Sequence, residues 1–227
     1  MERTRNYEQA LIWAANLGAE GIVPTVWIPR SAFISAAKSA DGSVSFTRDG
    51  FGLGIGNNPI IEEDWERFAL PKRLEKAKTA QYKLVNRWNP YQISTSGFTE
   101  LFGVEKIKDD GIADYLKANA PDSSTYPGSD EIQFWAGLRI DGDLKALGCV
   151  AKWESGEMVI SSVATKLTER GKGYGSRLTR GILALGNLDQ IKVLTLAVNA
   201  KNEIAAKMYE KIGFQSLGEF NTFERAL

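Results

Sequence analysis

The stretch RGKGYGSRL, residues 170–178, decides how this chain is interpreted. Its three glycines, Gly171, Gly173 and Gly175, alternate with other residues directly before the apolar stripe of a predicted helix. Glycine costs a helix about 1 kcal/mol relative to alanine. Three glycines at the start of a helix therefore indicate that a bare backbone is needed there.

A strand candidate, residues 157–165, ends just before this loop, and a helix is predicted from Tyr174 to Gly186. A helix N-terminus has unpaired N–H groups and about half a positive charge, and glycines let several amides face one anion. The loop is therefore predicted to hold a phosphate or pyrophosphate, with Arg170 as a cation. It lacks the G-x-x-x-x-G-K-[ST] pattern of nucleotide-binding P-loops and does not fit the dinucleotide pattern G-x-G-x-x-G.

The elements around the loop predict a mixed α/β (α+β) fold. Three strand candidates form a meander before it, with Asp141-Gly142 and Ser155-Gly156 as hairpin turns. After it follow the helix, a strand predicted to be buried on both faces, a second helix between Asn202 and Gly213, and a last strand. The strand ranges are 132–140, 144–153, 157–165, 191–199 and 214–220.

Upstream, residues 89–94 are predicted to form a first strand, 98–121 one or two short helices, and 122–130 a loop. No internal repeat or low-complexity segment is evident. We divide the chain into an N-terminal α/β extension, residues 1–85, and a second domain, residues 86–227.

Within the extension, a helix over 6–17 is predicted to stop at Gly18. Residues 22–30 and 43–56 are predicted to be rich in strands and turns, and 62–88 to be helical with a break at Pro71. The glycines at 52, 54 and 56 precede Asn-Asn-Pro rather than a helix, which favours a strand with one bare face over a phosphate loop.

The composition excludes several kinds of function. Basic and acidic residues are equal, 28 each, so no overall field attracts nucleic acid or anionic membrane. Histidine is absent, which excludes a histidine-containing triad and a histidine-ligated metal. The single cysteine, Cys149, favours a cytoplasmic protein. The apolar stretch 10–29 is interrupted by Asn16, Glu20 and Pro24, which argues against a membrane span.

Two further motifs give the loop a family context. They are SVAT, residues 162–165, and NEIAAKMYEKIGF, residues 202–214. With the R-x-x-G-x-G pattern of Arg170, Gly173 and Gly175, they resemble the GNAT superfamily of acyl-CoA N-acyltransferases. The resemblance covers about residues 130–227 well and 86–130 loosely. It implies a mainly antiparallel, splayed sheet flanked by helices, here with an N-terminal extension.

The resemblance also implies the site. The loop amides would hold the pyrophosphate of coenzyme A, and the preceding strand would pair with its pantetheine arm. The coenzyme-binding residues so implied are Val163, Ala164, Thr165, Arg170, Gly171, Lys172, Gly173, Tyr174, Gly175, Ser176 and Asn202. The alternatives are a tight turn for the loop, a plain helix cap for Asn202 and a core tyrosine for Tyr209.

The implied reaction is direct transfer of an acetyl group from acetyl-CoA to a primary amine, without a metal. By resemblance, Tyr209 would protonate the leaving thiolate and a backbone N–H near Val163 would stabilise the oxyanion. The amine needs a base, and without histidine a carboxylate or a water chain must serve. Glu157 is the first candidate, ahead of Glu154 and Glu131, and alternation along the strand would place it on one face with Val159, Ser161 and Val163.

The acceptor is expected to be a small-molecule or peptide amine, bound by residues 98–121, the 122–130 loop and the last strand. Residues 1–85 are expected either to cover this site, with Trp13, Trp27 and Trp65 as apolar surface, or to mediate docking or dimerisation, which would give a homodimer. The competing functions are a non-catalytic acyl-CoA-binding module and, less favoured by the balanced charge, a nucleic-acid-binding protein.

Overall fold

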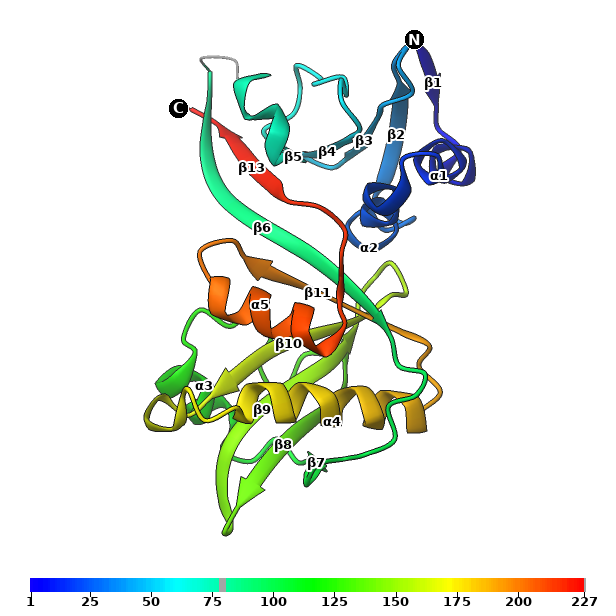
Figure 1. The fold of residues 1–227 in the computed structure, drawn as a ribbon. Coiled ribbons are helices and arrows are strands. Elements are labelled where there is room, and N and C mark those ends of the chain that lie inside the picture. Colours follow the sequence, from blue (N-terminus) through cyan, green and yellow to red (C-terminus); the bar gives the residue numbers. More distant parts are fainter. Residues whose placement is uncertain (78–80, 227) are drawn as a thin grey trace.

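One sheet runs through the whole molecule. The computed structural model describes residues 1–77 and 81–226, and 13 of its strands join in a single, mainly antiparallel sheet. Figure 1 shows an N-terminal lobe, with β1–β5, α1 and α2, stacked on a C-terminal lobe, with β7–β11 and α3–α5. The long strand β6 (Tyr82–Ser94) crosses from one lobe to the other. The predicted mixed fold class is confirmed.

The C-terminal lobe contains the predicted meander. Strands β8 (Ile132–Ile140), β9 (Asp143–Lys152) and β10 (Met158–Thr165) pair antiparallel, and β7 (Val104–Ile107) extends the sheet beside β8. Asp141 and Gly142 both have positive φ, 51° and 79°, as a tight hairpin turn requires. The 98–121 region contains one helix, α3 (Ile112–Asn119), while part of it forms β7 instead.

The second half of this lobe follows the prediction as far as its last strand, where residues 214–220 form only the two-residue β12 (Gln215–Ser216) and Phe220 already belongs to the next strand. Helix α4 (Tyr174–Leu188) leads to β11 (Val193–Asn199), and α5 (Glu203–Ile212) ends at Gly213 with φ 113°. Helices α4 and α5 pack on one face of the sheet, and α3 packs on the other. The expectation that residues 191–199 are buried on both faces is wrong, because Ala197 and Asn199 are exposed.

The N-terminal lobe combines confirmed and wrong predictions. The first helix forms as α1 (Tyr7–Ala15), and residues 43–56 form β3 (Val44–Arg48) and β4 (Phe51–Ile55). Residues 22–30 are not β-rich: they contain α2 (Val23–Trp27), in whose first turn Pro24 is well accommodated. The remaining elements are β1 (Glu2–Thr4), the 3₁₀ helix η1 (Gly18–Ile22) and β2 (Phe33–Lys38).

The prediction that residues 62–88 are helical is also wrong. This stretch forms β5 (Arg67–Pro71), the 3₁₀ helix η2 (Lys72–Ala77) and the start of β6, while residues 78–80 lie outside the described residues. Both strands pair with β13 (Phe220–Arg225), more than a hundred residues away in sequence. The boundary that we place between residues 85 and 86 therefore lies inside β6.

The two lobes repeat one order of elements. In each, an antiparallel meander is followed by a parallel strand: β2-β3-β4 then β5, and β8-β9-β10 then β11. The closing strand, meaning the strand that pairs next to the parallel strand, is exchanged between the lobes. β6 follows β5 in the chain but pairs with β11, and β13 follows β11 but pairs with β5. The structure thus contains a topological repeat that is not evident in the sequence.

The repeat is incomplete in the N-terminal lobe, where no helix joins β4 to β5. The fully buried Trp65 fills the space beside β4, and a Cβ on Gly52 would lie only 2.1 Å from its ring. This confirms the interpretation of the 52–56 glycines as a strand with a bare face, and leaves the C-terminal lobe as the one with a glycine loop at a helix N-terminus.

Candidate active site

Strands β10 and β11 diverge after a single register pair, Val159 with Thr195. From there to Thr165, the edge of β10 that faces β11 has no strand partner. On the other edge, the register with β9 shifts between Ser161 and Ala164, so that β10 contains a bulge. An open strand edge next to a bulge is a place where another extended, amide-containing group can pair.

The bulge is held by the loop that follows α3. Ser162 has a positive φ of 53°. Its hydroxyl donates to the carbonyl of Thr125 at 2.7 Å and accepts from the amide of the same residue at 3.1 Å. The bulge also switches the faces of β10. Val163 packs toward α4, beside Gly148, while Ser161 points the other way and contacts Thr125. The expectation that Val163 shares a face with Glu157, Val159 and Ser161 is therefore wrong.

The glycine loop leaves open space in front of α4. Gly171 and Gly173 both have φ 80°, and a Cβ on either would meet nothing within 4 Å. Gly173 is the N-cap of α4 and offers no side chain to its first N–H groups. Gly175 differs, because a Cβ there would lie 3.4 Å from both Thr165 Oγ1 and Met208 Sδ. The first turn of α4 thus lies against the end of β10 with its amides uncapped, a cradle suited to an anion.

The cations of the loop already have partners. Lys172 Nζ lies 2.7 Å from Glu169, which Lys145 also contacts at 2.9 Å. These two ammonium groups lower the pKa of the Glu169 carboxyl. Arg170 donates to the backbone carbonyl of Asn119 at 2.7 Å, and the Asn119 side chain accepts from the Leu167 amide at 2.8 Å.

Sequence reasoning missed Asn119. It is 8% exposed, lies at the end of α3 and fixes a loop about fifty residues later in the chain. No local pattern around Asn119 indicates this contact, because it exists only once α3 packs beside the η3 turn (Leu167–Glu169).

The second motif forms a capped helix. The side chain of Asn202 accepts from the amide of Ala205 at 3.2 Å, which confirms the predicted cap. Tyr209 is only 6% exposed, and its ring lies 5.3 Å from Phe214 and 6.4 Å from Tyr91 between centroids. Burial raises the pKa of its hydroxyl, for which we find no hydrogen-bond partner within the described residues.

Glu157 lies just before β10, next to the hairpin turn. Its carboxylate is half-buried, and burial raises its pKa. The Val159–Thr195 pair separates it from the gap between β10 and β11. Cys149 is buried in β9, and burial raises the pKa of its thiol to about 12, so it is an unreactive core residue.

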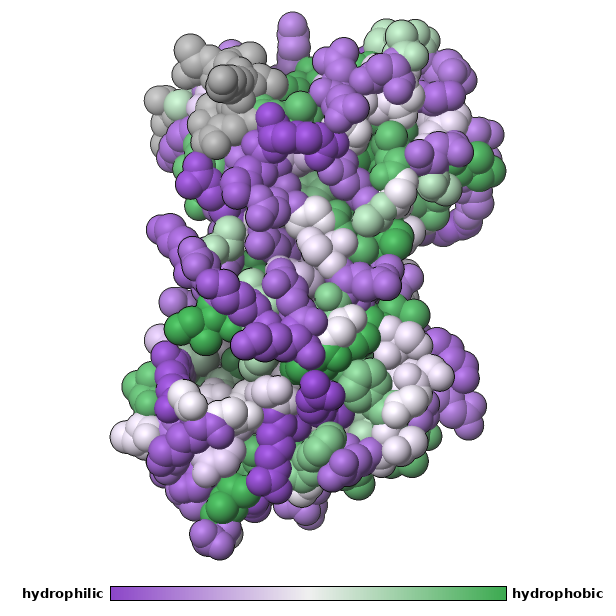
Figure 2. Space-filling view, in the orientation of Figure 1, coloured by the Kyte–Doolittle hydropathy of each residue, from purple (hydrophilic) through white to green (hydrophobic). Residues whose placement is uncertain are grey.

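A cleft of about 740 Å³ lies where the two lobes meet. Figure 2 shows the molecule narrowed at this level. Both lobes line the cleft, and its side chains include Trp27, Arg48, Asp49, Phe51, Glu66, Arg67, Asn86, Trp88, Asp122, Ser124, Ala197, Val198, Asn199, Thr222 and Glu224. Ser124 connects it to the bulge, because its hydroxyl oxygen lies 3.0 Å from that of Ser161.

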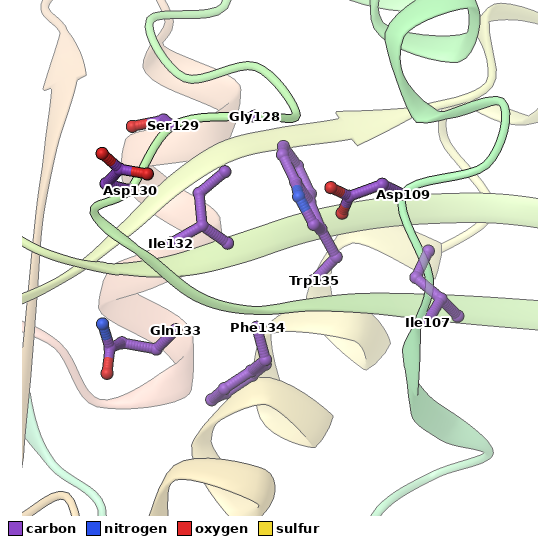
Figure 3. A pocket seen from close by; sticks show the side chains of 9 residues that line it. All are labelled: Ile107, Asp109, Gly128, Ser129, Asp130, Ile132, Gln133, Phe134 and Trp135. Carbon is purple, nitrogen blue, oxygen red and sulfur yellow. The ribbon is translucent and has the colours of Figure 1, made fainter.

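A second pocket, of about 400 Å³, lies at the edge of β8. Figure 3 shows Ile132 and Trp135 pointing to the side where Asp109 and Asp130 lie, and Phe134 pointing away. None of its lining residues belongs to the glycine loop, β10 or β11.

The sequence model of the acetyltransferase (GNAT) family matches residues 98–214, about half of the chain and including the loop and the second motif. The chain belongs to this family. Membership supports acyl transfer from an acyl-CoA as the reaction of this enzyme. No curated protein matches the sequence.

Solved structures of the family share the fold over nearly the whole chain. An acetyltransferase from the GNAT family of Colwellia psychrerythraea is 12% identical, with a TM-score of 0.54 and 100% of both chains covered. A GCN5-related N-acetyltransferase from Kribbella flavida is 12% identical, with a TM-score of 0.57, covering 96% of this chain and 95% of that one. One from Sphaerobacter thermophilus is 11% identical, with a TM-score of 0.57, covering 99% and 95%.

These likenesses include the N-terminal lobe, which lies outside the matched family region. None of the described helices is both long and apolar enough to cross a bilayer.

Proposed function

We propose that this GNAT protein is an N-acetyltransferase that transfers an acetyl group from acetyl-CoA directly to a primary amine. The observation that carries the proposal is the open edge of β10, which leads into the uncapped N-terminus of α4. A strand edge pairs with amides and a helix N-terminus binds phosphates. Coenzyme A carries both groups, in its pantetheine arm and its pyrophosphate.

In this proposal, the backbone of Val163, Ala164 and Thr165 pairs with the pantetheine arm, and the loop 170–176 holds the pyrophosphate. The open space above Gly171 and Gly173 supports this role. Asn202 caps α5 through its side-chain oxygen, which leaves its NH₂ group to donate to the coenzyme.

The transfer needs a hydrogen-bond donor for the oxyanion, an acid for the leaving thiolate and a base for the amine. The amine nitrogen attacks the thioester carbonyl, the carbon–sulfur bond breaks, and the amine loses a proton. We assign the oxyanion donor to the backbone N–H of Val163, beside the bulge. We assign the acid to Tyr209, whose hydroxyl is protonated at neutral pH and can donate its proton to the leaving thiolate.

We assign the base to Glu157. Its raised pKa brings it closer to neutrality, which suits a base. Because its carboxylate does not line the cleft, it would act through water. The acceptor amine would enter through the cleft between the lobes, so that residues 1–85 cover the site. The equal charges and the single cysteine support a cytoplasmic enzyme without a nucleic-acid partner.

A non-catalytic acyl-CoA-binding module is the alternative. The observation that favours it is the position of Glu157, which is separated from the strand gap by the Val159–Thr195 pair. A panel of primary amines with acetyl-CoA, scored by release of free thiol, tests the two proposals. Turnover on any amine supports the enzyme, whereas binding of acetyl-CoA without turnover on every amine supports the module.

A further inference from the structure

Three hydroxyl groups form a hydrogen-bonded row beside the β10 bulge. Ser161 Oγ lies 2.8 Å from Thr125 Oγ1 and 3.0 Å from Ser124 Oγ, so the Ser161 hydroxyl stands between the other two. Thr125 and Ser161 are buried, whereas Ser124 is exposed and lines the cleft between the lobes. The row therefore leads from the interior of the C-terminal lobe to the cleft.

The number of protons indicates the direction in which these hydroxyls donate. Each hydroxyl has one proton, and the two contacts use two of the three. The donation order Thr125 to Ser161 to Ser124 leaves the Ser124 proton free to point into the cleft. Any other order leaves over the proton of Thr125 or Ser161, and neither buried hydroxyl has a further partner among residues 1–77 and 81–226. A buried donor without a partner is costly, so the first order is favoured, and accepting a hydrogen bond also strengthens Ser124 as a donor.

The cleft reaches the gap between β10 and β11 at the level of Ser161. The two strands run parallel from the Val159–Thr195 pair, so two residues further along each strand Ser161 is level with Ala197. Ala197 lines the cleft, as does Ser124, which is bonded to Ser161. The Ser124 hydroxyl therefore lies at the mouth of the gap, on the face of the sheet opposite to α4 and its glycine loop.

The bulge holds Ser124 as well as the backbone N–H of Val163. Ser162 bonds both backbone groups of Thr125, donating to its carbonyl at 2.7 Å and accepting from its amide at 3.1 Å. Ser124 is thus held through its neighbour Thr125 and through Ser161. Two donors fixed to one bulge suit an oxyanion hole, because preorganised donors need no rearrangement when the charge develops.

We infer that the Ser124 hydroxyl is a second donor to the oxyanion and therefore a catalytic residue of the acyl transfer. This inference rests on the proposed function and adds a residue to it. When the amine nitrogen adds to the thioester carbonyl, the electron pair of the C=O π bond moves to the oxygen, which accepts from the Val163 N–H and the Ser124 hydroxyl. The electron pair returns when the carbonyl forms again and the carbon–sulfur bond breaks, so Ser124 keeps its proton throughout. Ser161 and Thr125 act through Ser124, as positioning residues.

The test measures the single-turnover rate of thiol release with saturating acetyl-CoA and an amine that the panel identifies. Loss of one oxyanion donor typically lowers the rate about 100- to 1000-fold, and for an exposed hydroxyl, which water can replace, we expect about 10- to 100-fold in Ser124→Ala. Ser124→Thr keeps a hydroxyl and should recover most of the rate. Ser161→Ala leaves the Ser124 hydroxyl in place and should lose less than Ser124→Ala. The matched control Ser96→Ala, which removes an exposed hydroxyl outside the cleft, should keep the full rate.

The affinity for acetyl-CoA separates this role from a structural one. A donor that acts on the oxyanion contributes to the transition state and not to the bound ground state. The Kd of acetyl-CoA should therefore differ less than about 2-fold between Ser124→Ala and Ser96→Ala. A weaker Kd with an unchanged rate would overturn the inference, and so would equal rates in the two variants. Either result leaves the acetyltransferase proposal standing.

If no amine is acetylated, the bound thioester itself becomes the readout. Acetyl-CoA labelled with ¹³C at the thioester carbonyl should show a downfield shift of that carbon on binding, because hydrogen bonds polarise the carbonyl. A smaller shift in Ser124→Ala than in Ser96→Ala supports the inference, and equal shifts overturn it. Failure of acetyl-CoA to bind at all overturns both this inference and the proposed function.

Discussion

Replacing Gly173 with alanine separates backbone strain from coenzyme binding, because Gly142 provides a matched control. Gly173 has φ 80° and Gly142, in the β8–β9 turn, has φ 79°; a Cβ at either position would meet nothing within 4 Å. Alanine in this left-handed conformation costs about 1–2 kcal/mol. For a chain of this size, either substitution should lower Tm by about 2–8 °C.

The two variants should differ only when acetyl-CoA is present. At about 100 times its Kd, the ligand adds about 2.7 kcal/mol to the wild-type protein, or about 5–11 °C in Tm. A methyl group at position 173 would enter the space in front of the α4 amides. Loss of one hydrogen bond to a charged group, at about 1.5–3 kcal/mol, weakens binding about 10- to 150-fold. At 100-fold weaker binding, the same ligand concentration adds about 0.4 kcal/mol, or about 1 °C.

The assay is thermal unfolding with and without acetyl-CoA, with ATP as the ligand control. We expect Gly142→Ala to keep the full acetyl-CoA shift and Gly173→Ala to lose nearly all of it. Equal acetyl-CoA shifts in both variants would refute the reasoning, because the loop would then be only a turn. An ATP shift as large as that of acetyl-CoA would refute the coenzyme assignment itself.

Two further substitutions test the proposed acid and base. Tyr209→Phe should lower turnover about 100-fold, the low end for general acid catalysis, because water can substitute for the hydroxyl. The Tm should change little, since the hydroxyl has no hydrogen-bond partner in the described part of the chain. Unchanged turnover with chemistry rate-limiting would make Tyr209 a core residue. Glu157→Gln should lower turnover and raise Tm at pH 7, because a carboxyl whose pKa is raised by burial destabilises the fold as pH rises above its ordinary pKa of about 4.3. The Tm gain should vanish below that pH in thermal scans, and a gain that persists there would contradict the assignment of a buried, ionised carboxylate.

The well-predicted part of the fold is the part whose signals are local. Asp141-Gly142 defines a hairpin within four residues, and Asn202 and Gly213 mark both ends of α5 through hydrogen bonds to their own helix. Gly171 and Gly173 likewise have positive φ values, a backbone conformation that glycine adopts without strain because it has no Cβ. These features depend on neighbours in sequence, so the sequence predicts them.

The poorly predicted part depends on distant partners. Residues 62–88 contain many good helix formers, yet two of their segments, β5 and the start of β6, pair as strands with β13 and β11. Hydrogen bonds to a neighbouring strand can override weak local helix preference, and the partner residues are far away in the chain. The α2 segment shows the reverse case, because its β-branched residues pack as a short helix in the core beneath β2–β4.

By itself, the sequence determined the glycine loop, the capped helix of the second motif and, through both, the GNAT fold of the C-terminal half. Only the tertiary structure decided that Asn119 holds Arg170, that a bulge at Ser162 turns Val163 to the opposite face, and that two lobes with exchanged closing strands enclose a cleft. The physical reason is how far apart in the sequence the interacting residues lie. Caps and turns satisfy backbone groups within a few residues, whereas a cleft or a strand exchange requires contacts that exist only after distant segments have packed.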